Sequence, residues 1–130
     1  MARVFRRPVI FILVGSAAAL THLMTVILLV ENAHLAPLVA NVGGWLCAFG
    51  VSYGGHYLLT FADHAARALQ SIFRFFVLSA SGFAINESAY AILLRTSSAP
   101  YPVLLAIILA CVAVLTYLLS RHWAFADTSP

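Results

Sequence analysis

Four apolar stretches, each about as long as a membrane crossing, occupy almost the whole chain. They span residues Val9–Val30, Leu38–Phe61, Ile72–Leu94 and Val103–Leu119. A helix needs about 20 apolar residues to cross the hydrocarbon core of a bilayer. Only 8% of the 130 residues are charged, whereas soluble domains have about 25%. The sequence therefore predicts one all-α integral membrane domain over residues 1–130, with four transmembrane helices and no soluble domain.

The segments between these stretches are short and polar. We expect connecting loops at Glu31–Pro37, Ala62–Ser71 and Arg95–Pro102, where charged residues, serine and proline interrupt the apolar pattern. The first stretch has an alternative interpretation as a signal peptide, because arginines precede it and three alanines, 17–19, resemble a cleavage region. Its apolar run continues well past that point, which favours a spanning helix.

The arginines predict the orientation of the chain in the membrane. All seven basic residues are Arg; six fall on the side of the termini and only Arg95 on the other. Positive residues accumulate in cytoplasmic loops, so both termini are predicted to be cytoplasmic. These arginines lie at the ends of apolar spans, where they contact membrane lipids. They form no continuous basic patch, and no nucleic acid partner is expected.

The second apolar stretch is rich in glycine, with Ala40, Gly44 and Ala48 spaced four residues apart. Small residues at this spacing let helix backbones approach closely in lipid. Packing within the chain is the favoured interpretation, and a contact with another subunit or a substrate groove is the alternative. Because a bundle of this size is small for enclosing a lipid head group, we also predict a homodimer.

Four polar side chains from three of the predicted helices fall at one depth. His22, Asn41, Asn86 and Glu87 all lie about 8 to 12 Å from the non-terminal ends of their helices at a rise of 1.5 Å per residue. Ionisable groups inside a bilayer usually mark a binding site or pathway. They are predicted to bind the hydroxyls of a substrate or to pass a proton between His22 and Glu87. The alternative is that they satisfy one another and hold the helices together.

On the terminal side, Arg7, Arg74 and Arg121 begin or end three different helices, and His56 is expected nearby. A guanidinium group binds a phosphate through two parallel hydrogen bonds, so these residues are predicted to bind a lipid phosphate. No catalytic constellation is present, and the two cysteines, Cys47 and Cys111, lack histidines at ligand spacing. We therefore expect neither an enzyme, a metal site nor a cofactor.

The chain also resembles itself when it is shifted by 64 residues. This shift pairs Phe11 with Phe75, Cys47 with Cys111, and residues 61–63 with the same three residues at 125–127. The matches cluster at equivalent helix ends, and each half contains two spans. We therefore predict two tandem helical hairpins, residues 9–63 and 73–127, arranged as parallel repeats about an axis along the membrane normal.

The residues at the start of each repeat resemble those of the GtrA-like proteins, a family of small four-helix membrane proteins. The family pattern is a basic residue, Phe and a Val-Gly pair, followed seven residues later by Asn or Asp. The first repeat has Phe11, Val14 and Gly15, with His22 at the Asn or Asp position. The second repeat has Arg74, Phe75, Ser79 in place of Gly, and Asn86.

The ends of the repeats continue this resemblance, because the family pattern there is Ser, Asn, a basic residue, Trp and Phe. The first repeat keeps Ser52 and Phe61, with His56 at the Asn position, and the second keeps Arg121, Trp123 and Phe125, with Ser120 at the Asn position. The resemblance implies a flippase or carrier component in the bacterial cytoplasmic membrane. Its substrates would be polyprenyl-phosphate-linked sugars for cell-surface polysaccharide synthesis or modification, often beside a membrane glycosyltransferase.

Two other functions remain open from the sequence. A small multidrug-resistance-like proton antiporter also has four short helices around an intramembrane Glu, but that Glu lies in its first helix, whereas Glu87 lies in the third stretch here. A non-transporting anchor would instead bind a glycosyltransferase through the glycine-rich face of the second stretch.

Overall fold

The computed structural model describes the backbone of residues 2–60 and 65–126, and the side chains of residues 9–55, 57–58, 72–116 and 118. Within these residues all regular secondary structure is helical. The helices are α1 (Ala2–Ala33), α2 (Pro37–Thr60), α3 (Ala65–Thr96) and α4 (Tyr101–Ala126). The all-α prediction is confirmed.

Three of the helices extend well beyond the apolar stretches that predicted them. Residues 65–71, expected to form part of a loop, are the first two turns of α3, and α1 begins at Ala2 instead of Val9. At its other end α4 continues to Ala126. The loop prediction was wrong here because hydropathy marks only the part of a helix that suits hydrocarbon. Alanine, arginine and glutamine, which are frequent in these extensions, are good helix formers in any solvent.

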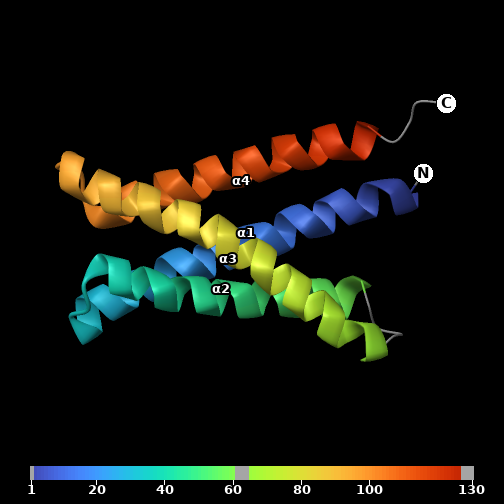
Figure 1. Ribbon diagram of the computed structural model, residues 1–130, viewed down its shortest axis with the longest axis horizontal. Coiled ribbons are helices and arrows are strands. Elements are labelled where there is room, and N and C mark those ends of the chain that lie inside the picture. Colours follow the sequence, from blue (N-terminus) through green and yellow to red (C-terminus); the bar gives the residue numbers. More distant parts are fainter. Residues whose placement is uncertain (1, 61–64, 127–130) are drawn as a thin grey trace.

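The helices form two hairpins whose connections lie at the same end of the bundle (Figure 1). We call this the hairpin end; both chain termini lie at the opposite, terminal end. At the hairpin end α1 is closed by His34, whose φ of 53° is left-handed. The reversal lets the Leu35 N–H donate to the Leu29 carbonyl at 3.2 Å, and the Pro100 carbonyl accepts from Val103 and Leu104 at the start of α4.

Helices α1 and α2 approach each other closely because glycines line the contact. A Cβ atom placed on Gly44 would lie 2.5 Å from Cδ2 of His22 and 2.9 Å from its backbone oxygen. Similar additions at Gly43 and Gly55 would meet Leu29 and Val14 at 2.7 and 2.9 Å. The small-residue face of α2 is therefore filled from within the chain, as the favoured interpretation predicted.

The buried core lies toward the hairpin end, where all four helices contribute. It consists of Val26, Ala40, Tyr90, Leu104, Leu105 and Ile108. Toward the terminal end α4 diverges from α3 (Figure 1), and residues 113–116 are all exposed. Among the described side chains, the buried core therefore lies at the hairpin end.

The buried residues follow the 64-residue shift. Five buried residues of the first hairpin have a buried residue 64 positions later: the pairs are His22 and Asn86, Val26 and Tyr90, Ala40 and Leu104, Asn41 and Leu105, and Gly44 and Ile108. The same register that aligns the two sequence halves thus aligns their buried positions.

Two of the described helices, Val9–Ala33 and Ile72–Thr96, are long and apolar enough to cross a membrane. The apolar part described for α4, Tyr101–Thr116, is shorter. Length and composition therefore indicate a membrane protein, and the number of four crossings stays a prediction.

Candidate functional site

The four polar residues expected at one depth form a single hydrogen-bonded cluster. Nε2 of His22 lies 2.7 Å from Oδ1 of Asn41. The side-chain amide of Asn41 donates to Oδ1 of Asn86 at 2.9 Å and to Oε2 of Glu87 at 2.5 Å. We call these four residues the polar cluster. It joins α1, α2 and α3, and Asn41 is its centre.

The local sequence explains why these side chains meet. His22 approaches α2 closely because Gly44, one turn after Asn41, has no side chain to exclude its ring. On α3, Asn86 and Glu87 are neighbours in the chain and differ by about 100° around the helix. Their two side chains therefore approach the amide of Asn41 from either side, and each accepts one of its two hydrogens.

Both side-chain donor hydrogens of Asn41 are used. Because its nitrogen donates to two acceptors, its oxygen is assigned toward His22, and Nε2 of that ring then carries the hydrogen. An amide therefore lies between the imidazole and the carboxyl group, and His22 and Glu87 share no direct hydrogen bond. The cluster as it stands is arranged for hydrogen bonding and offers no direct proton transfer between these two residues.

Burial distinguishes Glu87 from the other three members. Asn41 is 0% exposed, and His22 and Asn86 are 5% and 4% exposed. Glu87 is half-buried. Any group that approaches the cluster from outside the bundle would therefore meet the carboxyl group of Glu87 first.

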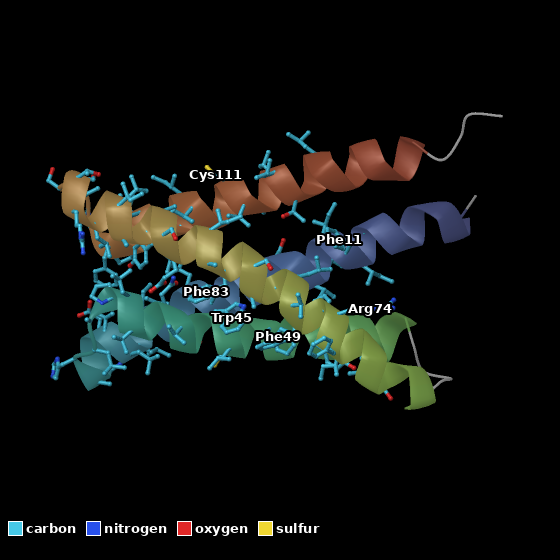
Figure 2. All side chains as sticks on the ribbon, viewed as in Figure 1. Phe11, Trp45, Phe49, Arg74, Phe83 and Cys111 are labelled. Atoms are coloured by element: carbon cyan, nitrogen blue, oxygen red, sulfur yellow. The ribbon has the colours of Figure 1, made fainter. Side chains whose placement is uncertain are left out.

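A row of aromatic rings continues from the cluster toward the terminal end, between α2 and α3. Its members, which we call the aromatic seam, are Trp45, Phe49 and Tyr53 on α2 and Phe75, Phe76 and Phe83 on α3; three of them are labelled in Figure 2. The indole of Trp45 stacks on Phe83 with centroids 4.8 Å apart, and its Nε1 donates to Oγ of Ser79 at 2.9 Å. We did not predict this seam from the sequence. The signal was the four-residue spacing of the aromatic residues on α2.

The predicted phosphate-binding residues are described only in part. Arg74 is exposed on α3, toward the terminal end of the bundle (Figure 2). The side chains of Arg7, His56 and Arg121 lie outside the described residues. The convergence of the three arginines on one phosphate therefore stays a prediction.

A second polar contact joins the hairpins at the hairpin end. The hydroxyl of Tyr101, the first residue of α4, donates to Oε1 of Glu31 at 2.5 Å, and the hydroxyl of Tyr90 donates to the Tyr101 carbonyl at 3.3 Å. The hydrogen bond to the Glu31 carboxylate, together with desolvation, raises the pKa of Tyr101 to about 12. This contact fastens the start of α4 to the end of α1.

The described residues contain no group of three His, Cys, Asp or Glu side chains that could hold a metal ion. Cys47 and Cys111 are both free and exposed on the helix surfaces. Between α2 and α3, the polar cluster and the aromatic seam are the two groups of described side chains that combine specific geometry with access from outside.

Comparison with known proteins supports one assignment. Neither the curated proteins nor the solved structures include a match to this chain. A family model described as the GtrA/DPMS transmembrane domain matches residues 10–125, which contain the apolar parts of all four helices, the polar cluster and the aromatic seam. The protein therefore belongs to the GtrA/DPMS transmembrane domain family.

Proposed function

We propose that this protein translocates polyprenyl-phosphate-linked sugars across the bacterial cytoplasmic membrane, as a flippase or carrier component in the synthesis or modification of cell-surface polysaccharide. The family membership supports this proposal. The observation that carries it is the polar cluster, which places a half-buried carboxyl group and three buried polar side chains inside otherwise apolar helices. Packing alone does not require a carboxyl group at this position.

The substrate is an amphiphile whose parts match different regions of the bundle. Its sugar hydroxyls would exchange hydrogen bonds with Glu87 and then with the amides behind it. Before the sugar arrives, the members of the cluster satisfy one another, and no buried side-chain nitrogen or oxygen of the described residues lacks a partner. Each hydrogen bond broken on binding is replaced by one to a hydroxyl, which keeps the exchange close to balanced in free energy.

The phosphate of the substrate would be bound at the terminal end. Arg74 is exposed there, and we include Arg7, Arg121 and His56 in the same proposed site. With both termini in the cytoplasm, as the six to one distribution of arginines indicates, the phosphate starts on the cytoplasmic side. The sugar then moves toward the polar cluster, which lies nearer the hairpin end.

The arrangement also bears on the two alternative functions. The stretch of α2 proposed to bind a glycosyltransferase, which includes Ala40, Gly44 and Ala48, is buried, and its glycine packs against α1. A partner enzyme would have to use another surface. The carboxyl group inside the bundle is on α3 and bonded to an asparagine, unlike the first-helix Glu of a small multidrug-resistance-like antiporter.

The test is a translocation assay with purified protein in lipid vesicles and a fluorescent polyprenyl-phosphate-linked sugar. We expect wild-type protein to accelerate movement between leaflets, and Glu87→Gln to slow it at least tenfold. The matched control is Glu31→Gln, which removes a carboxylate at the hairpin end but leaves an oxygen to accept from Tyr101. Arg74→Ala should also slow movement, with Arg95→Ala, at the other end of α3, as its control.

The proposal has clear failure conditions. No acceleration by folded wild-type protein would exclude translocation by this chain alone. If Glu87→Gln and Glu31→Gln move the lipid-linked sugar at equal rates, the polar cluster has no role in translocation.

A further inference from the structure

The aromatic seam is not part of the buried core. The core lies toward the hairpin end and is aliphatic except for Tyr90. None of the six seam rings is buried, and Phe76 is 40% exposed. Each ring of the seam therefore keeps some accessible surface. Aliphatic residues, like those of the core, would have been enough to pack α2 against α3.

The two faces of α2 make contacts of different kinds. Toward α1, glycines such as Gly44 bring the backbones close together, and a single added methyl group would collide. Toward α3, the contact is made by the rings of Trp45, Phe49 and Tyr53 against those of α3. Separation of α2 from α3 would thus replace the ring–ring contacts and the hydrogen bonds of Trp45 and Asn41 by contacts with the entering group. It would leave the backbone packing of α1 on α2 intact.

The seam and the polar cluster are continuous along both helices. Trp45 follows Asn41 by four residues on α2, and Phe83 precedes Glu87 by four residues on α3, so both pairs share a helix face. The indole and the phenyl ring stack on each other one turn from the carboxyl group. The indole is also held in place by its hydrogen bond to Ser79.

This combination suits a sugar better than a hydrocarbon chain. Ligand sites are lined mainly by apolar and aromatic side chains, with a few polar groups that fix orientation. A sugar ring has an apolar C–H face that packs on an aromatic ring, and hydroxyls at its edge that bond to carboxylates and amides. An isoprenoid chain has no group that could form a hydrogen bond with the carboxyl group of Glu87, and the exposed apolar faces of the bundle already suit such a chain.

We propose that the aromatic seam is the binding surface for the sugar ring of the substrate. The C–H face of a pyranose stacks on Trp45, Phe49 and their neighbours while its hydroxyls bond to Glu87. This inference rests on the proposed function and adds to it a binding surface and a ligand class, a pyranose with free hydroxyls. The sugar passes between α2 and α3 from the terminal end to the polar cluster.

Trp45 supplies a direct readout of binding. The chain has two tryptophans, so the variant Trp123→Phe leaves Trp45 as the only indole. Its fluorescence would be titrated in detergent micelles with citronellyl phosphate esters of glucose, galactose, mannose and rhamnose. Citronellyl phosphate without a sugar is the matched probe. We expect at least one sugar ester to change the emission and to bind at least tenfold more tightly than the phosphate alone.

The outcomes of this titration separate the occupants of the seam. An equal response to the sugar esters and to citronellyl phosphate would assign the seam to the isoprenoid chain and overturn the proposal. No response to any ester, with folded protein, would show that the seam is packing only.

Variants of single rings test the stacking itself. Phe49, which contacts Trp45, Tyr53, Phe75 and Phe76, would be changed to Leu and to Tyr. Phe49→Leu should weaken binding of the responsive ester at least tenfold, and Phe49→Tyr should restore most of it because a ring is present again. Phe73→Leu is the control, since Phe73 is 69% exposed on α3 and lies outside the seam. Circular dichroism and size-exclusion chromatography would verify that each variant is folded.

Failure of this inference differs from failure of the proposed function. If Phe49→Leu transports and binds like wild type while Glu87→Gln does not transport, the seam is not the sugar surface and translocation stands. The opposite outcome is that the sugar esters change the fluorescence of Trp45 while wild-type protein moves no lipid-linked sugar. That result would support the seam as a binding surface and exclude translocation by this chain alone.

Discussion

The side-chain nitrogen of Asn41 lies 2.9 Å from Oδ1 of Asn86, a residue 45 positions further along the chain. Because the same amide accepts from His22 and donates to Glu87, one side chain links the first hairpin to the third helix. Asn41 therefore makes all three hydrogen bonds of the polar cluster.

Replacement of Asn41 by Leu should destabilise the protein by about 2 kcal/mol. The change removes three interhelical hydrogen bonds, and such bonds contribute about 0.6 kcal/mol each within membranes. Leucine has a similar size, so the loss reports mainly on polar contacts. The free energy of unfolding in detergent micelles would measure it, with Asn32→Leu, at the exposed end of α1, as the control. A loss no larger than that of the control would contradict the central role of Asn41.

Two glycines on α2 should respond in opposite ways to the same substitution. Gly44→Ala places a methyl group against His22 and Val26, and overpacking of this kind costs about 1 to 3 kcal/mol. Gly50 has nothing within 4 Å of the added Cβ. Gly50→Ala should therefore be neutral or stabilise the helix by up to about 1 kcal/mol. The unfolding temperatures of both variants would measure this difference. Equal unfolding temperatures would contradict the close approach of α1 and α2.

Glycine at position 34 should stabilise the first hairpin. His34 has a φ of 53°, and the left-handed conformation costs a residue with a Cβ about 1 kcal/mol. His34→Gly removes that cost and should raise the unfolding temperature. His34→Val, whose branched side chain suits this conformation poorly, should lower it. The prediction fails if the valine variant is as stable as the glycine variant.

Alkaline pH should weaken the contact between Glu31 and Tyr101. The pKa of Tyr101 is raised to about 12 from an ordinary value of 10.0, so the folded state holds its proton more tightly than the unfolded state. The contribution to stability is complete below pH 10 and is lost as the pH rises from 10 toward 12. Tyr101→Phe should lack this component, so the stability difference between wild type and variant should shrink across that interval in denaturant titrations.

The sequence was sufficient to predict the helices and the residues of the polar cluster. Each apolar stretch marked one helix, and counting along the helices placed His22, Asn41, Asn86 and Glu87 at one depth. The helix extensions at Ala2 and residues 65–71 could not be found in this way, since hydropathy reports the solvent of a segment and not its backbone conformation.

The contacts between side chains required the structure. Depth along a helix does not give the angle around its axis relative to a neighbour, so the central position of Asn41 was not visible in the sequence. The pairing of Trp45 with Phe83, two residues 38 positions apart, depends in addition on how α2 and α3 cross. The small residue at position 44 predicts close helix packing. Its contact with the ring of His22 also depends on the rotamer of that histidine, which the sequence does not give.

The buried positions that repeat after 64 residues do not repeat in size. Where the first hairpin contributes Ala40 and Gly44, the second contributes Leu104 and Ile108, and Val26 has Tyr90 as its counterpart. Two copies of the first hairpin would leave voids at these positions, and two copies of the second would overfill the same volume. At these described positions the two hairpins are therefore complementary in volume: small residues of the first lie in the same packed layer as large residues of the second.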